Sequence, residues 1–272
     1  MKQTNQSYAL ISVFDKTGIV DLAKIFMEGK IKIISTGGTA KYLQEHGIEI
    51  IPVEQITHSP ESFDGRMKSI SFQLASGILF DRKNASHQKD ADKLNIPHID
   101  YVVCNFYDFW KNPGIEMIDV GGPTMVRAAA KNYESITVLV DPENYPEVIN
   151  EINEVGMVSE TLRKVLAAKA FSYVADYDGM IANYFQKQTD GQELFISLQD
   201  GRKLRYGENP HQEGSFFTDT SSKDELGLGT FQRLQGKDTS YSNYLDLDAG
   251  LQTISLIGQK KPACVILKHT NP

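Results

Sequence analysis

The chain has 272 residues, of which 40% are hydrophobic and 23% charged, and its formal net charge is −7. This length suggests two domains, and the negative charge argues against nucleic acid or an anionic membrane surface as a partner. The two cysteines are too few for a disulfide scaffold or a cysteine-based zinc site. Because the first residues do not resemble a signal peptide and no apolar run would span a bilayer, we predict a cytoplasmic protein. Because no set of metal-ligand residues has the spacing of a metal site, we also predict that it uses no metal.

Short apolar strands alternate with helical patterns over the first part of the chain. Tight links between such elements are typical of an α/β fold with a parallel, Rossmann-like sheet and helices on both faces. The predicted strands are residues 8–14, 31–35, 48–53, 99–106 and 135–140, and the predicted helices are residues 19–29, 40–47 and 123–132.

The second part of the chain begins with a long helical extension and then changes character. Residues 143–187 are almost purely helical in pattern, and the polar stretch "QKQTDGQE" that follows is typical of a linker. We therefore place a domain boundary near residues 190–200. Beyond it we expect a strand at 194–198, irregular structure at 202–217, a helix at about 241–258 and a closing strand at 264–267.

Polar residues follow the first two predicted strands, where ligands of parallel sheets collect. Ser12 and Lys16 follow the first strand, and the second runs directly into the turn Ser35-Thr36-Gly37-Gly38-Thr39 before a helix. Backbone N–H groups at a glycine-rich helix start can hold a phosphate, but the same turn can be only a glycine turn with an N-cap threonine. The two readings are about even for the turn alone, and the neighbouring lysine favours phosphate.

Further polar residues stand at the later strand ends. They are Arg66 and Lys68 on one side of an extended segment, Asn105 and Tyr107 after the fourth strand, Asp119 before the turn Gly121-Gly122, and Lys131 at the end of the next helix. Taken singly, the pair Arg66 and Lys68 is typical of a solvated face, Tyr107 of a packed aromatic ring and Asp119 of a helix cap. Together they supply anion donors, an acid, a phenol and lysines for proton transfer. We find no nucleophile–base pair, no metal-ligand cluster and no nucleotide P-loop.

Nine segments, in order, resemble one enzyme family. The segments "SVFDKTGIVDLAK", "STGGTAKYL", "GRMKS", "CNFY", "IDVGG" and "RAAAKN" are similar to the N-terminal domain of the bifunctional phosphoribosylaminoimidazolecarboxamide (AICAR) formyltransferase / IMP cyclohydrolases of purine biosynthesis. The segments "LRYGENPHQ", "LQGKDTSYSNYLDLDAG" and "CVILKHTNP" resemble the start of that family's transformylase domain. The resemblance implies a methylglyoxal synthase-like cyclohydrolase domain at residues 1–195. It also implies the truncated beginning of a cytidine deaminase-like α/β transformylase domain at residues 196–272.

The resemblance also implies the reaction. The cyclohydrolase closes the ring of formyl-AICAR to IMP with loss of water and without a cofactor, whereas the transformylase of a full-length chain uses 10-formyltetrahydrofolate. Family members form homodimers, largely through the transformylase half. The implied phosphate and substrate ligands are Ser12, Lys16, Ser35, Thr36, Gly37, Thr39, Arg66, Ser69, Asn105, Gly121 and Gly122. The implied catalytic residues are Lys68, Tyr107, Asp119 and Lys131, and the transformylase-half candidates are Arg205, Tyr206, Lys268 and His269.

The sequence departs from the family pattern at two places beside the predicted site. Ser69-Ile70-Ser71-Phe72 stands where the family usually has Thr-Leu-His-Pro, and the segment between "CNFY" and "IDVGG" is shorter than usual. These departures keep a second hypothesis open, a non-catalytic phosphate- or nucleotide-binding module of the methylglyoxal synthase-like type. We further expect Lys268 and His269 to be inert in this chain alone, since the resemblance implies that the rest of their site lies beyond Pro272.

Overall fold

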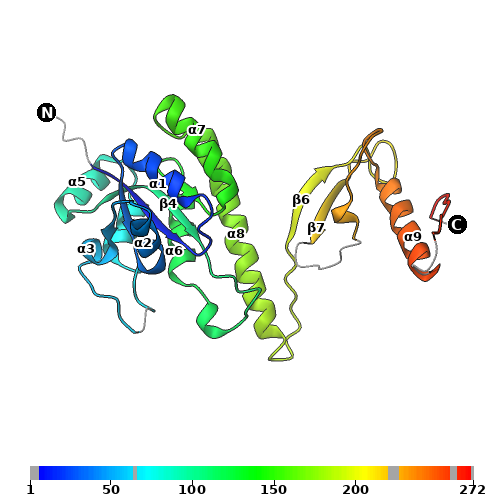
Figure 1. The fold of residues 1–272 in the computed structure, drawn as a ribbon, viewed down its shortest axis with the longest axis horizontal. Coiled ribbons are helices and arrows are strands. Elements are labelled where there is room, and N and C mark those ends of the chain that lie inside the picture. The colour runs from blue at the N-terminus through cyan, green and yellow to red at the C-terminus, as the bar shows by residue number, and fades with distance from the viewer. Residues whose placement is uncertain (1–5, 64–65, 220–226, 258–261, 271–272) are drawn as a thin grey trace. The chain divides into compact units, whose positions relative to one another are not determined.

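The computed structural model describes residues 6–63, 66–219, 227–257 and 262–270 (Figure 1). The chain forms two compact units, Met1–Glu193 and Leu194–Pro272, and each is described here by itself.

The first unit is built on a five-stranded parallel sheet, as the sequence predicts. Its strands are β1 (Ser7–Val13), β2 (Lys32–Ser35), β3 (Ile51–Pro52), β4 (His98–Asn105) and β5 (Thr137–Leu139). Their order is β3-β2-β1-β4-β5, and every neighbouring pair is parallel. The chain winds outward from β1 on one side and from β4 on the other, so the boundary between β1 and β4 is the topological switch point where such sheets bind ligands.

Helices link the strands and cover the sheet. They are α1 (Ile19–Glu28), α2 (Gly37–Glu45), α3 (Val53–Thr57), α4 (Phe72–Leu79), α5 (Ala85–Leu94), α6 (Gly121–Lys131), α7 (Tyr145–Val155) and α8 (Glu160–Gln186), with short 3-10 turns η1 (Ile115–Met117) and η2 (Pro142–Asn144). The sequence reading missed α4 and α5, and it overextended the third strand, because α3 begins at Val53. A two-residue edge strand followed by a short helix leaves too little periodicity to recognise.

The start of α4 explains how the chain accommodates one of its departures from the family pattern. Ser71 is the N-cap of α4, and its Oγ accepts a hydrogen bond from Leu74 N at 3.2 Å. Its backbone is extended, at φ −148° and ψ 156°, which is also the conformation that a residue before proline requires. A serine cap therefore starts this helix without a proline at its first position.

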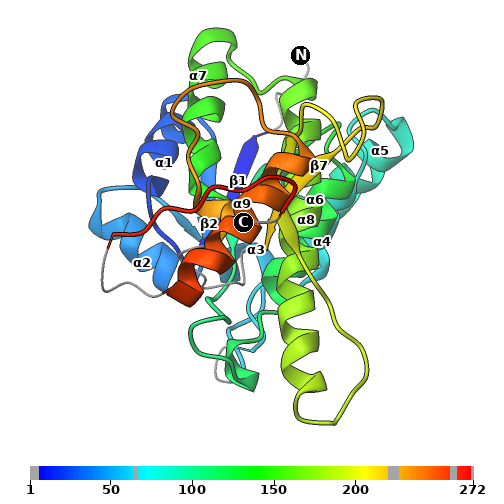
Figure 2. The same cartoon turned by 90° about the vertical axis from the view of Figure 1, so that its right-hand side faces the viewer.

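Two apolar clusters lie on opposite faces of the sheet. On β1, Leu10 belongs to the cluster under α4, α6 and α8, whereas Ala9, Ile11 and Val13 belong to the cluster under α1, α2 and α7. Figure 2 shows α1 and α2 on one side of β1 and β2 and α4, α6 and α8 on the other. The alternation of side chains along each strand thus divides the core into two layers, since successive residues point to opposite faces.

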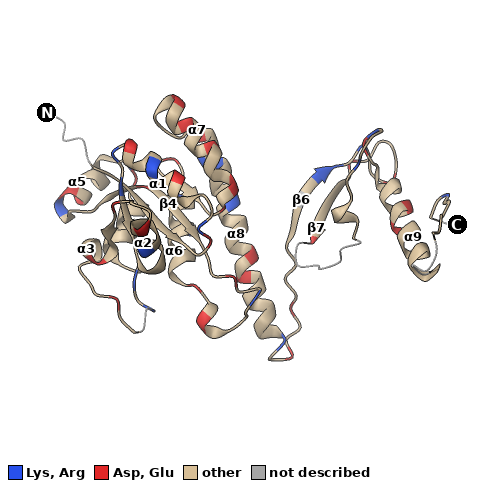
Figure 3. Ribbon diagram, in the orientation of Figure 1, with Lys and Arg blue, Asp and Glu red and all other residues tan. Residues whose placement is uncertain are grey.

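The charged residues of the first unit are spread over its helices. α7 carries glutamates and no basic residue, whereas α8 carries its basic residues in the first half and two aspartates, Asp176 and Asp178, in the second (Figure 3). Among the described residues, no helix is long and apolar enough to cross a membrane.

The second unit contains an antiparallel pair, β6 (Leu198–Lys203) and β7 (Ser215–Asp219), then a 3-10 turn, η3 (Leu228–Thr230), and α9 (Tyr241–Ile257). The strand predicted at 194–198 was wrong, because β6 begins where that segment ends. The strand predicted at 264–267 was also wrong, since this segment pairs with no described strand and Ile266 is 84% exposed. Apolar runs become strands only where a neighbouring strand takes their backbone hydrogen bonds.

One partly buried ion pair stabilises the edge of the sheet where its strands begin. Arg82 donates to the carbonyl oxygens of Phe80, Gly77 and Ile99, at 2.6, 2.8 and 2.6 Å, and lies 3.6 Å from Asp100 Oδ1. Ser7 Oγ donates to the other carboxylate oxygen of Asp100. Burial raises the pKa of Asp100, so the carboxylate depends on these partners to stay ionised.

We expect Arg82→Met to lower the free energy of unfolding by about 3 kcal/mol, because it leaves a desolvated carboxylate without its cation and removes a donor from three carbonyls, of which Phe80 O keeps Asn132 Nδ2 at 3.1 Å. Lys83→Met is the matched control, since the pair between Lys83 and Glu134 is exposed, at 62% and 52% of the side chains. It should change the free energy of unfolding far less than Arg82→Met does, because exposed ion pairs contribute little. Urea unfolding of both variants measures the difference, and equal effects would contradict the role given to Arg82.

Candidate active site

The N-terminus of α2 presents free hydrogen-bond donors at the carboxyl end of β2. The first intrahelical bond runs from Ala40 N to Thr36 O at 3.2 Å, so the N–H groups of Gly37, Gly38 and Thr39 precede it. The hydroxyl of Thr36 is buried and has no hydrogen-bond partner among the described residues. Gly37 adopts φ +53°, which favours glycine. These donors, together with the positive end of the helix dipole, form a site for an anion.

Two lysines flank this helix start. A Cβ built on Gly37 would lie 3.7 Å from Lys68 Nζ, which shows that the ammonium group stands directly over the turn. Lys68 is 3.1 Å from Glu61 Oε1, and the two side chains are 30% and 41% exposed. Lys16 Nζ lies 6.0 Å from the ring centroid of Tyr42 on α2. The positive charge that a phosphate needs is therefore local, in a protein of net negative charge.

Three residues predicted to touch the ligand form hydrogen bonds within the scaffold. Ser35 Oγ donates to Ile11 O at 2.8 Å, and Thr39 Oγ1 donates to Val13 O at 2.9 Å while accepting from Val13 N at 3.0 Å. Asn105 Oδ1 accepts from the N–H groups of Phe14 and Asp15, at 2.6 and 2.8 Å. These side chains join the ends of β1, β2 and β4 and fix the loop that carries Lys16. Ser12, at the end of β1, is half-buried.

Asp119 stands at the N-terminus of α6. Its Oδ1 accepts a hydrogen bond from Gly122 N at 2.9 Å. Burial raises the pKa of Asp119, and the hydrogen bonds from the Gly122 and Gly121 backbones act in the opposite direction. A partly buried carboxylate with a raised pKa and no described ion-pair partner is suited to accept a proton from a ligand.

The two glycines after Asp119 permit close approach. A Cβ on Gly122 would lie 2.5 Å from Asp119 Oδ2 and 2.9 Å from Phe106 Cδ1, and a Cβ on Gly121 would lie 2.6 Å from Ser69 Oγ. Any larger residue at either position would displace the carboxylate or the serine. Since Ser69 follows Lys68 in the chain, one loop places Lys68 at the start of α2 and Ser69 at the start of α6.

The remaining predicted residues lie at different distances from the starts of α2 and α6. Tyr107 is 44% exposed, and its ring contacts Phe14 edge-on, with centroids 5.8 Å apart. It borders a pocket of about 560 Å³ at the carboxyl ends of β1, β4 and β5. Arg66 is exposed and pairs with Glu116.

Lys131 is not brought to the centre within this chain. It is the last residue of α6, whereas Gly121 is the first. A rise of roughly 1.5 Å per residue separates the two ends by about 15 Å, more than a lysine side chain spans.

The chain matches two known protein families. Residues 18–124 match the MGS-like domain family, and residues 129–272 match the family described as AICARFT/IMPCHase bienzyme. The chain belongs to the AICARFT/IMPCHase bienzyme family. The resemblance indicated by the sequence motifs is thereby confirmed, as is the parallel-sheet α/β fold with an MGS-like domain.

Relatives in this AICARFT/IMPCHase family are similar along nearly the whole chain. The bifunctional purine biosynthesis protein PurH of Clostridium botulinum (strain Loch Maree / Type A3) is 43% identical over 272 residues, which cover 97% of this chain and 54% of PurH. PurH of Caldicellulosiruptor saccharolyticus is 43% identical over 279 residues, with the same shares covered. The chain therefore spans about half the length of the curated relatives it matches.

A solved structure also resembles the fold. The crystal structure of ForH is 30% identical and has a TM-score of 0.61, and the match covers 66% of this chain and 97% of ForH.

The second unit of this AICARFT/IMPCHase chain holds the other predicted residues. Arg205 donates through NH2 to Tyr206 OH at 3.1 Å, and hydrogen bonds from Ser240 and Arg205 lower the pKa of Tyr206. Lys268 and His269 are both exposed, and the next residue, Thr270, donates through its N–H to Asp246 Oδ1 at 2.7 Å. Tyr206 O also accepts a hydrogen bond from Tyr241 N at 3.1 Å, so both groups are attached to the N-terminal half of α9.

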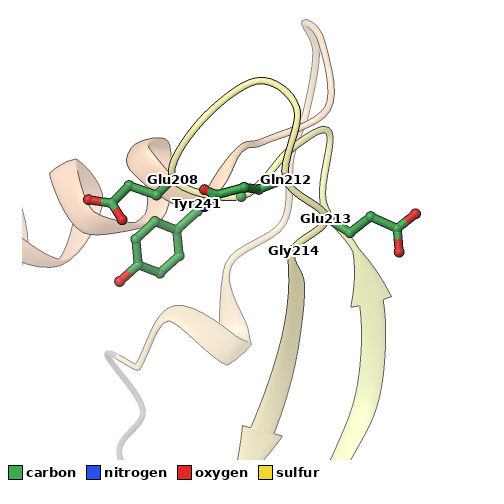
Figure 4. A pocket seen from close by; sticks show the side chains of 6 residues that line it. Glu208, Gln212, Glu213, Gly214 and Tyr241 are labelled. Carbon is green, nitrogen blue, oxygen red and sulfur yellow. The ribbon is translucent and has the colours of Figure 1, made fainter.

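A pocket of about 490 Å³ lies beside Arg205 and Tyr206. It is lined by Gly207, Glu208, Gln212, Glu213, Gly214 and Tyr241. Figure 4 shows the carboxylates of Glu208 and Glu213 on opposite sides and pointing away from each other, with the Tyr241 ring beneath the loop. The pocket therefore has no carboxylate pair for acid–base chemistry. No group of three or more potential metal ligands occurs among the described residues.

The sequence reading missed three residues that contact the site. Glu61 pairs with Lys68, and two tyrosines of α8, Tyr173 and Tyr177, reach the backbone around Phe106 and Asp119. In the sequence, tyrosines at helical spacing indicate only a buried helix face, and nothing in a local pattern reveals which strand end lies opposite.

Proposed function

We propose that the first unit is an IMP cyclohydrolase, which closes the ring of formyl-AICAR to IMP with loss of water. The observation that carries this proposal is the convergence of two helix N-termini, at Gly37 and Gly121, on one loop that contributes Lys68 and Ser69. We assign residues 1–195 to this domain and residues 196–272 to the N-terminal part of an AICAR transformylase domain.

The start of α2 suits the 5′-phosphate of the substrate. The free N–H groups of Gly37, Gly38 and Thr39 can each donate to a phosphate oxygen, and the unpartnered hydroxyl of Thr36 can donate a fourth hydrogen bond. Lys68 and Lys16 supply the countercharge. Binding the phosphate here directs the base of the nucleotide toward the end of β4 and the start of α6, where Tyr107 and Asp119 lie.

The ring closure proceeds by proton transfer between groups of the substrate and the protein. The carboxamide nitrogen attacks the formyl carbon and loses one proton, so a C–N bond forms and negative charge develops on the formyl oxygen. This oxygen takes up two protons in all and departs as water when its bond to carbon breaks. The formamide nitrogen then loses its proton and forms a double bond to the same carbon, which completes the ring. We assign Asp119 as the acceptor of the nitrogen proton and Tyr107 as the donor that stabilises the oxygen, while Lys68 acts at the phosphate. Because both reacting groups belong to one substrate, holding them in register supplies much of the acceleration.

The second unit supports a proposal for longer family members. We infer that Arg205, Tyr206, Lys268 and His269 contribute to a transformylase site for AICAR, with 10-formyltetrahydrofolate as the formyl donor and a homodimer as the assembly. In favour of this, α9 contacts both residue pairs, through Tyr241 N and Tyr206 O and through Asp246 and Thr270 N.

The decisive experiment is incubation of the purified chain with formyl-AICAR in the presence of a metal chelator and without folate, with IMP followed by chromatography. The proposed function predicts IMP formation well above the uncatalysed rate. Binding of AICAR nucleotide with no IMP above background would favour the alternative, a non-catalytic nucleotide-binding module.

The rate of IMP formation should fall on the acid side of the pH profile. Asp119 must be deprotonated to accept a proton, and burial raises its pKa above the ordinary value of 3.8. The midpoint of the acid limb of kcat should therefore lie above pH 3.8, at a pH where an exposed aspartate is still ionised. Measuring kcat from pH 4 upward tests this, and a constant kcat down to pH 4 would contradict the assignment of Asp119.

A further inference from the structure

The long helix α8 contributes two phenol groups to the backbone of the candidate site. Tyr177 OH accepts a hydrogen bond from Asp119 N at 2.8 Å and donates one to Met117 O at 2.9 Å. Tyr173 OH accepts a hydrogen bond from Phe106 N at 3.0 Å, at the end of β4. One turn of α8 thus contacts both chain segments that carry the proposed acid–base residues.

Aromatic packing joins these contacts into one unit. The ring of Phe106 lies between the two tyrosines, with centroid distances of 4.7 Å to Tyr173 and 4.9 Å to Tyr177. On its other side, Phe106 lies so close to Gly122 that a Cβ there would be 2.9 Å from Cδ1. Phe106 therefore packs between α8 and the start of α6, whose backbone donates to the Asp119 carboxylate.

Both phenols keep their protons in this environment. Burial raises the pKa of Tyr173 to about 12, and burial also raises the pKa of Tyr177. Tyr177 can therefore donate to Met117 O and accept from Asp119 N throughout the pH range in which an acid–base enzyme works. Since Asp119 N is bonded to the Cα that carries the side chain, this hydrogen bond fixes where the side chain begins.

We propose that Tyr177 is a positioning residue for Asp119 in the cyclohydrolase site, and that Tyr173 supports it through Phe106. This role rests on the proposed function. Both hydrogen bonds of the Tyr177 hydroxyl go to backbone atoms, so we give it a positioning role and no part in the chemical step. It holds the segment from Met117 to Asp119 against α8, so that the carboxylate stays in hydrogen-bond contact with the start of α6 and faces the nucleotide.

The test compares Tyr177→Phe with Tyr184→Phe on the same helix. Tyr184 packs its ring against Phe109, with centroids 5.4 Å apart, so both substitutions remove one hydroxyl from a packed ring of α8. Displacement of a catalytic group by about 1 Å can slow a reaction by about 100-fold, so Tyr177→Phe should lower kcat by about 10-fold or more while KM changes less than about twofold. Tyr184→Phe should match the unmodified chain, and Tyr173→Phe should show a smaller loss of kcat than Tyr177→Phe.

A second measurement separates positioning from mere support of the fold. In an Asp119→Asn background, Tyr177→Phe should cause no further fall in the single-turnover rate constant. The carboxylate that Tyr177 positions is absent there, so its position no longer affects the rate. Equal losses in both backgrounds, or a kcat for Tyr177→Phe equal to that of Tyr184→Phe, would overturn the positioning role. Absence of IMP formation by the unmodified chain would instead overturn the proposed function, and this role with it.

Discussion

Asp119→Asn is expected to lower kcat for IMP formation by about 10²- to 10⁴-fold, the range typical of the loss of a general base. The amide keeps the size of the side chain, and its oxygen can still accept the hydrogen bond that Gly122 N donates to Oδ1 at 2.9 Å. The start of α6 should therefore remain intact, while no group at that position can take a proton. Steady-state kinetics with formyl-AICAR measure the loss.

Asp21→Asn on α1 is the control for this substitution. Asp21 is 79% exposed and lies near Lys24, at 3.9 Å, away from the helix starts that form the site. It should leave kcat unchanged. If Asp119→Asn retained kcat within about threefold, another group would have to be the proton acceptor and the mechanism given to Asp119 would fail.

Lys68→Met should reduce kcat/KM by about 100-fold or more, with an increase in KM as well as a fall in kcat. The ammonium group stands over Gly37, where the phosphate is proposed to bind, and charge-assisted hydrogen bonds are roughly twice as strong as neutral ones. The substitution also leaves Glu61, at 3.1 Å, without its cation, so a carboxylate would face the incoming phosphate. Thermal unfolding with and without inorganic phosphate gives a separate readout, because stabilisation by phosphate should be lost.

Lys131→Met is the matched control, and it tests the predicted catalytic lysine that lies at the other end of α6. Lys131 ends α6 about 15 Å from Gly121, given roughly 1.5 Å of rise per residue, so we expect kcat/KM to change less than about twofold. A loss as large as that of Lys68→Met would mean that Lys131 acts in a site outside the monomer described here, such as that of a second copy of the chain.

Much of the first unit could be predicted from local patterns. Buried strands such as β1 and β4 are long apolar runs, and Gly37 and Gly38 between a strand and a helix mark the anion-binding turn, because backbone dihedral preferences and side-chain periodicity act over a few residues. The family resemblance added the set of polar residues at the strand ends. The weak signals were the short ones, the two-residue β3 and the helix α3 directly after it.

The sequence by itself determined the alternation of strands and helices, the glycine turns and the candidate polar residues. Only the tertiary structure showed that Thr39 and Asn105 fix the scaffold, that Lys131 lies at the far end of α6, and that Tyr177 of α8 contacts Asp119, 58 residues away in the chain. The physical reason is that local patterns report the conformation of single elements. Which side chains meet depends on the packing of sheet and helices, and on hydrogen bonds between segments that no short-range pattern connects.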